Sequence, residues 1–162
     1  MSSRTRVAIA SDKSGFPLKQ AVVEYLNNRD DIEIIDFGLN SLDEVQPYDA
    51  QAPKVARAIQ NAEADRGVLI CGTGQGMAIV ANKHQGIYAV VAETTFAAAR
   101  GRAINNANVL TMGGWITAPI LGVEIVKSWL ALEFTETMED RAEWLRAAFS
   151  RVQQLEQENF AQ

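Results

Sequence analysis

A glycine-rich segment containing a cysteine is the part of the sequence best suited to chemistry, and residues 71–77 read CGTGQGM. The segment follows a continuous apolar run over 67–71 and opens a helical pattern near 76–83, so it is expected to join a buried strand to a helix. Its three glycines remove side chains where backbone N–H groups can converge, and a helix N-terminus adds partial positive charge. The segment therefore predicts an anion-binding loop.

The spacing does not fit two common phosphate-binding motifs. Its glycines are arranged G-x-G-x-G instead of G-x-G-x-x-G, and Glu93, the nearest acidic residue, lies past the end of the next strand. No Gly-Lys-Ser/Thr follows, which excludes a P-loop. A dinucleotide or nucleoside triphosphate site is therefore not predicted.

The cysteine gives this loop a reactive group. The thiol of Cys71 would lie in the field of the amide dipoles, which favours its thiolate form. A thiolate beside an anion-binding loop can take a proton from carbon while the amides hold the developing enolate oxygen. The spacing also leaves open that Cys71 is an inert, buried residue at a strand end.

Apolar runs that alternate with helical patterns give the expected fold. The strands are expected over 7–10, 32–37, 67–71, 87–91 and 108–112, and helices follow residue 15 and near 49–63, 76–83, 95–104, 118–132 and 138–158. This alternation predicts an α/β fold, a three-layer Rossmann-like sandwich with a five-stranded parallel sheet and an extended C-terminal helix. We expect one domain over residues 1–162.

Composition limits the classes of partner. The net charge of −5 disfavours nucleic acid and anionic membranes, and a single cysteine excludes an internal disulfide. No apolar run reaches membrane-span length, and the first residues do not resemble a signal peptide, so a cytoplasmic protein is expected. Ligands of parallel sheets bind beyond the carboxyl ends of the strands. The loops 11–15, 71–77 and 92–95 are therefore the expected site, and the long loop 39–51 is expected to be functional.

Three segments resemble one family. Residues 71–77 with Ala81-Asn82-Lys83, residues 9–15 (IASDKSG), and residues 105–109 (NNANV) with Met112-Gly113 resemble motifs of the ribose-5-phosphate isomerase type B family, which includes the galactose-6-phosphate isomerase subunits. The similarity runs in one register from about residue 5 to 134. It is specific because the three motifs occur together.

The resemblance implies an aldose–ketose isomerase of sugar phosphates that works through a cis-enediolate without a metal or an organic cofactor. Cys71 matches the cysteine that is usually the base in the family. Some relatives use a glutamate base at the position of Gln75 instead, and because a glutamine cannot act as a base, Cys71 is the candidate in this sequence. The resemblance gives further roles: Gly72, Gly74 and Gly76 hold the enediolate oxygen, Thr73 assists ring opening, and Asp12, Tyr48 and Asn105 contact the sugar. It also implies a homodimer or homotetramer with sites at subunit interfaces, and the helix near 138–158 would suit such a contact.

The sequence departs from the family pattern at several positions. Ile104 stands in place of the ring-opening histidine, and Trp115 in place of a phosphate-binding arginine. Thr135-Glu136-Thr137-Met138 replaces the closing motif, and Arg141 lies one residue out of register among acidic residues. We interpret His84, the only histidine, as a surface residue.

These departures weaken the assignment to ribose 5-phosphate. A tetrose 4-phosphate cannot form a furanose ring through its esterified O4 and needs no ring opening, so the loss at Ile104 suits an open-chain tetrulose 4-phosphate. The remaining candidates for binding the phosphate are Lys13, Arg100 and Arg102.

Two alternatives remain. The chain could be one subunit of a hetero-oligomer like the galactose-6-phosphate isomerases, or a sugar-phosphate-binding protein without catalysis. The presence of Cys71 together with Thr73 favours the enzyme.

Overall fold

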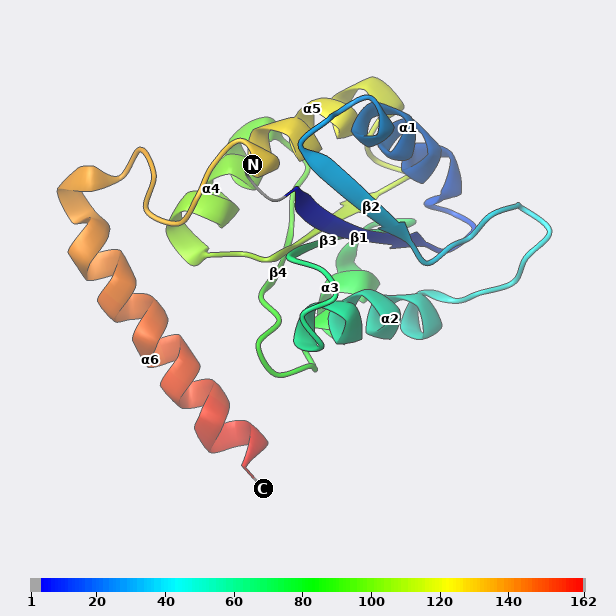
Figure 1. Cartoon of the computed structure of the whole chain (residues 1–162). Coiled ribbons are helices and arrows are strands. Elements are labelled where there is room, and N and C mark those ends of the chain that lie inside the picture. The colour runs from blue at the N-terminus through cyan, green and yellow to red at the C-terminus, as the bar shows by residue number, and fades with distance from the viewer. Residues whose placement is uncertain (1–3, 162) are drawn as a thin grey trace.

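Five parallel strands form one sheet, and helices connect them in chain order (Figure 1). The computed structural model describes residues 4–161. The elements are β1 (Thr5–Ser11), α1 (Phe16–Asn27), β2 (Ile32–Asp36), α2 (Tyr48–Gln60), β3 (Arg66–Cys71), α3 (Gln75–Ala81), β4 (Ala89–Val91), α4 (Thr95–Asn105), β5 (Val109–Gly113), α5 (Pro119–Leu130), a 3₁₀ turn (Glu139–Arg141) and α6 (Ala142–Phe160).

The sheet has the order β2-β1-β3-β5-β4, and helices cover both of its faces. One core cluster joins α1, α4 and α5 to the sheet and includes Ile9, Ile70 and Trp129. The other joins α2 and α3 to the opposite face and includes Ala10 and Cys71. Because both faces are covered, the central strands are mostly apolar, and 7–10 of β1 and 67–71 of β3 appear in the sequence as unbroken apolar runs. The predicted three-layer α/β fold is confirmed.

The strand register brings three loops together. Ser11 of β1 pairs with Ile70 of β3, and Cys71 of β3 pairs with Gly113 of β5. The segments that follow these three strands therefore begin side by side at the carboxyl edge of the sheet.

Several boundaries differ from the sequence-based prediction by a few residues. Tyr48 opens α2 after Pro47, so the irregular loop ends before residue 48 instead of at 51. The last helix begins at Ala142 instead of 138, because Thr135 and Thr137 have positive φ and a 3₁₀ turn precedes it.

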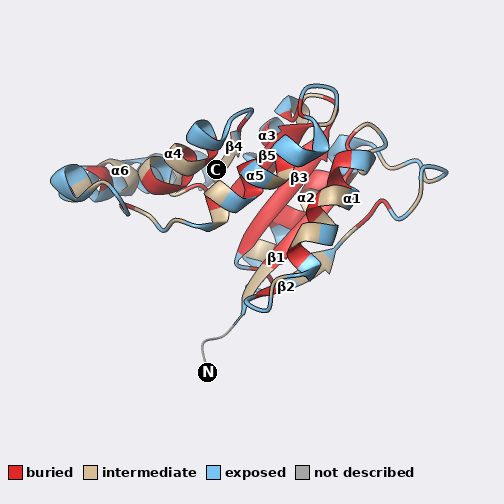
Figure 2. Ribbon diagram, turned by 90° about the horizontal axis from the view of Figure 1, so that it is seen from above, coloured by how far each residue is buried: buried red, intermediate tan, exposed pale blue. Residues whose placement is uncertain are grey.

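The C-terminal helix α6 lies apart from the three layers (Figure 1) and most of its surface is exposed (Figure 2). Its contact with the rest of the chain centres on Phe149, whose ring lies edge-on to Tyr88 with centroids 4.9 Å apart. Glu156 accepts hydrogen bonds from the Tyr88 hydroxyl at 2.8 Å and the Gly86 amide at 2.7 Å. Within residues 4–161, no helix is long and apolar enough to cross a membrane.

Candidate active site

Cys71 lies at the base of the glycine-rich loop, and its sulfur is hydrogen-bonded to that loop. The Gly74 amide donates to Cys71 Sγ over 3.1 Å, and the residue is 5% exposed. Gly74 is also the N-cap of α3, so the thiol lies at the positive end of the helix. A backbone N–H donor therefore points directly at the sulfur.

Gly74 is required by its conformation and by its surroundings. Its φ of +78° is in the left-handed region, where a side chain costs about 1–2 kcal/mol. A Cβ at this position would also lie 2.8 Å from the backbone carbonyl carbon of Met112. The close approach of the loop to β5 therefore depends on glycine.

Trp115 covers the first glycine of the loop. A Cβ at Gly72 would lie 2.8 Å from three atoms of the indole ring, and the Trp115 amide donates to the Gly72 carbonyl at 3.0 Å. The Gly114 amide donates to the Cys71 carbonyl at 2.7 Å. The indole is 75% exposed, so it forms an apolar wall beside the loop without adding a positive charge. The sequence identified Trp115 only as a missing arginine; its contact with Gly72 depends on the adjacent Gly113-Gly114 turn.

Tyr48 reaches the same loop from α2. Its ring atoms lie 2.9 Å from the position of a Cβ at Gly76, so the tyrosine contacts the last glycine of the loop. Gln51, one turn further along α2, is buried and donates to the Ser11 carbonyl at 2.8 Å. The start of α2 is thereby fixed to the loops after both β1 and β3.

Asp12 follows β1 and continues the ladder toward β3. Its amide donates to the Ile70 carbonyl at 3.1 Å, and its Oδ1 accepts from the Gly15 amide at 3.0 Å. Burial raises the pKa of Asp12 above its ordinary value of 3.8, and the Gly15 and Ser14 amides partly oppose this. A Cβ at Gly15 would clash with the Ile70 carbonyl oxygen, so the backbone of this turn packs directly against the backbone of β3.

An ion pair between a buried lysine and a partly exposed aspartate supports the neighbouring segment. Lys19, with a fully buried side chain, contacts both carboxylate oxygens of Asp36 at 2.7 and 2.8 Å. Asp36 also accepts from the Gly38 amide at 2.8 Å, and the Gly38 carbonyl accepts from the Ser11 amide at 2.8 Å. These bonds fix the backbone just before Asp12. The sequence analysis missed this pair, because only a folded sheet brings Lys19 next to Asp36.

The structure does not bring three of the predicted ligands to Cys71 within one chain. Asn105 ends α4 just before β5 begins, which places it at the opposite edge of the sheet. Arg102, one turn earlier, is buried and pairs with Glu133 at 2.6 Å and with the Asn106 side chain at 2.6 Å. Arg100 donates to Thr137 Oγ1 at 3.3 Å. Lys13 is exposed in the turn after β1, on the same edge as Cys71.

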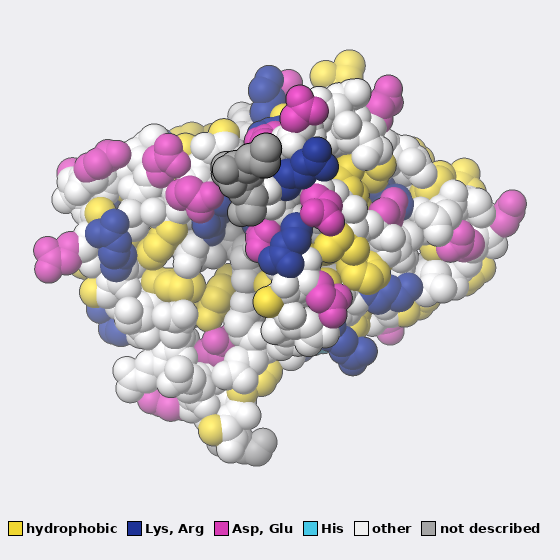
Figure 3. All heavy atoms as spheres, in the orientation of Figure 1, with side chains coloured by type: hydrophobic (Ala, Val, Ile, Leu, Met, Phe, Trp, Pro, Cys, Tyr) yellow, Lys and Arg dark blue, Asp and Glu magenta, His cyan; other side chains and the backbone are white. Residues whose placement is uncertain are grey.

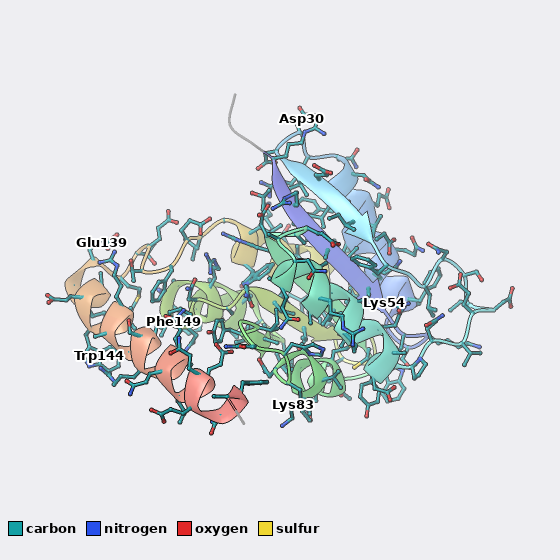
Figure 4. The ribbon with its side chains drawn as sticks, turned by 60° about the horizontal axis from the view of Figure 1, so that its bottom comes forward. Asp30, Lys54, Lys83, Glu139, Trp144 and Phe149 are labelled. Carbon is teal, nitrogen blue, oxygen red and sulfur yellow. The ribbon has the colours of Figure 1, made fainter. Side chains whose placement is uncertain are left out.

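Ile104 and Asn105 instead line a cavity of about 270 Å³ between α4, β4 and α6, with Phe149 on its other side. Figure 3 shows hydrophobic side chains in the hollow between α6 and the rest of the molecule. Phe149 lies on the side of α6 toward the sheet, whereas Trp144 lies near its outer side (Figure 4).

His84, which we interpreted as a surface residue, is partly buried. Its Nδ1 lies 3.1 Å from the Val80 carbonyl and 3.3 Å from the Ala81 carbonyl, at the end of α3. This position is remote from Cys71, since α3 runs from the carboxyl edge of the sheet to the other edge. In the part of the chain that the structure describes, no three His, Cys, Asp or Glu side chains gather as metal ligands would.

Comparison with known proteins agrees with the fold and the motifs. The Ribose/Galactose Isomerase family matches residues 7–145. The chain is 48% identical over 153 residues to the 4-deoxy-4-sulfo-D-erythrose isomerase of Clostridium sp. (strain MSTE9), covering 94% of this chain and 96% of the relative. It is 38% identical to the D-erythrulose-4-phosphate isomerase of Pectobacterium atrosepticum, covering 79% of this chain and 84% of the relative.

A solved structure of ribose-5-phosphate isomerase B from Clostridium thermocellum superposes with a TM-score of 0.87 at 33% identity, covering 96% of this chain and 99% of that one. The chain belongs to the ribose/galactose isomerase family. It is a sugar isomerase of this family, an enzyme that interconverts aldoses and ketoses.

Proposed function

We propose that this isomerase acts on an open-chain, four-carbon sugar with a charged group at C4, and that Cys71 is its base. The observation that carries the proposal is the hydrogen bond from the Gly74 amide to Cys71 Sγ, within a loop of backbone donors at a helix N-terminus. A thiolate held there can remove a proton from C1 of a ketose. The neighbouring amides can hold the oxygen of the cis-enediolate that forms.

The position of the only histidine of the sequence supports a four-carbon substrate. A cyclic sugar needs a proton donor and acceptor to open its ring, and the only histidine of the sequence caps the far end of α3. Two of the similar proteins are named for four-carbon sugars, with a sulfonate and a phosphate respectively at C4. A C4 sulfonate or a C4 phosphate ester prevents closure of a furanose ring, so neither substrate requires that step.

We further propose that the C4 group is a sulfonate. A phosphate monoester carries about −1.5 to −2 charges at neutral pH, whereas a sulfonate carries one. Arg102 is already paired with Glu133, and Trp115 presents an apolar ring beside the glycine loop. Of the three predicted phosphate ligands, Lys13 is the one that lies at the same edge of the sheet as Cys71 within one chain. A single lysine suits an anion with one negative charge better than an anion with two.

A substrate panel tests the proposal. Wild-type enzyme is assayed by NMR with 4-deoxy-4-sulfo-D-erythrulose, D-erythrulose 4-phosphate, ribulose 5-phosphate and tagatose 6-phosphate. We expect kcat/KM to be highest for the sulfonate and at least about tenfold higher for either tetrulose than for the longer sugars. Preference for ribulose 5-phosphate would contradict the four-carbon assignment. If no sugar is converted, the hetero-oligomer subunit or the binding protein becomes the better account.

A further inference from the structure

We propose that Asp12 carries the proton between the two oxygens of the enediolate, so that Cys71 and Asp12 divide the reaction between carbon and oxygen. This inference rests on the proposed function. An aldose–ketose isomerisation needs two proton transfers: one between C1 and C2, and one between O1 and O2. The thiol of Cys71 is suited to the first, and the second needs another acid–base group.

The strand register places Asp12 opposite Cys71. Ser11 pairs with Ile70, and the bond from the Asp12 amide to the Ile70 carbonyl extends the ladder by one residue. Asp12 and Cys71 are therefore neighbours across two strands, which lie about 4.8 Å apart in a sheet.

The two side chains also extend from the same face of the sheet. Side chains alternate along a strand, so Asp12 follows Ala8 and Ala10. These two alanines and Cys71 belong to the core cluster under α2 and α3. A substrate at the glycine loop would thus meet the thiol and the carboxyl group from one side.

Part of the Asp12 carboxyl group remains available. Oδ1 accepts from the Gly15 amide, which fixes the side chain, and Asp12 is only partly buried, so part of the carboxyl group stays open to a substrate. Burial favours the protonated form of Asp12, as an acid needs. Asp36, the last residue of β2, is held by Lys19 and cannot serve in the same way.

The step balances without an outside reagent. Cys71 thiolate removes a C1 proton from the ketose while the C2 carbonyl oxygen takes the proton of the Asp12 carboxylic acid. The Asp12 carboxylate then takes the proton of the O1 hydroxyl as the C1 carbonyl forms, and the Cys71 thiol returns its proton to C2. C1 is oxidised, C2 is reduced, and both side chains regain their starting states.

The test measures carbon exchange and isomerisation separately. Wild type, Asp12→Asn, Cys71→Ala and the control Asp49→Asn, an exposed carboxylate on α2, are incubated in D2O with 4-deoxy-4-sulfo-D-erythrulose, D-erythrulose 4-phosphate and, in parallel, ribulose 5-phosphate. NMR follows loss of the C1 proton signal and formation of aldose. Asparagine keeps the acceptor for Gly15, and circular dichroism checks the fold. If Asp12→Asn does not fold, Asp12→Ser keeps an acceptor oxygen and takes its place.

We expect Asp12→Asn to slow isomerisation at least about 100-fold while C1 exchange stays within about tenfold of wild type. Cys71→Ala should lose both, and Asp49→Asn neither. Equal loss of exchange and isomerisation in Asp12→Asn would reduce Asp12 to a substrate contact and overturn the inference, as would retention of both. A wild type that converts only ribulose 5-phosphate would contradict the four-carbon proposal. The effect of Asp12→Asn on C1 exchange and on isomerisation would then be measured with ribulose 5-phosphate. A wild type that converts none of these ketoses overturns both proposals.

Discussion

The amide of Gly74 donates a hydrogen bond to the sulfur of Cys71 over 3.1 Å, and this contact joins the proposed base to the glycine-rich loop. The geometry exists because Gly74 adopts a left-handed φ against the backbone of Met112. The loop conformation and the position of the thiol are therefore coupled.

Gly74→Ala should lower kcat at least about tenfold and destabilise the fold. Gly86→Ala is a matched control, because Gly86 has nearly the same φ of +77° but nothing within 4 Å of its Cβ position. Both variants carry about 1–2 kcal/mol of left-handed strain, and only Gly74→Ala adds a backbone clash. Urea unfolding and initial rates measure the two effects. Similar losses of activity in the two variants would show that the loop geometry is not critical.

Trp115→Arg should change the preference between terminal anions. A guanidinium beside Gly72 adds a charge that attracts phosphate more than sulfonate. We expect the ratio of kcat/KM for D-erythrulose 4-phosphate to that for the sulfonate analogue to rise at least about tenfold. Trp144→Arg, at an exposed tryptophan on α6, controls for the added charge. An unchanged ratio in Trp115→Arg would show that Trp115 does not determine the preference between the two substrates.

The contact between Tyr88 and Glu156 should make stability depend on alkaline pH. Burial, and then the hydrogen bond to Glu156, raise the pKa of Tyr88 from 10.0 to about 12. The folded state thus favours the protonated phenol, and this stabilisation is complete below pH 10 and lost as pH rises toward 12. Unfolding free energies measured across this range should fall less in Tyr88→Phe than in wild type. Parallel curves would show that the contact with α6 does not form.

The exposed apolar residues of α6 should hold two copies together. Val152 and Leu155 are 48% and 57% exposed and follow Phe149 along the helix, so the chain leaves an apolar surface there. We expect a homodimer or homotetramer by sedimentation velocity, and dissociation toward monomer in the double variant Val152→Glu/Leu155→Glu. The control Arg151→Glu/Gln154→Glu changes charge at polar positions of the same helix and should leave the mass unchanged. A monomeric wild type would refute this prediction.

The sequence was sufficient for the fold because both faces of the sheet are buried. Val68, Leu69 and Ile70 are all apolar, which distinguishes a central parallel strand from an amphipathic one. The position of Cys71 at the end of this strand, followed by glycines, located the candidate site. What the sequence did not reveal depends on contacts between distant segments. It did not indicate that Arg102 is paired with Glu133, nor that Trp115 lies on Gly72.

The most direct test of the account is the rate of isomerisation of 4-deoxy-4-sulfo-D-erythrulose by wild type and by Cys71→Ala, with Cys71→Ser as a second variant of nearly the same size as wild type. The account predicts measurable turnover by wild type and a fall in kcat of at least about 100-fold in Cys71→Ala, with the fold intact. A Cys71→Ala enzyme that keeps most of the wild-type kcat would contradict it, because the proton between C1 and C2 would then be carried by another group.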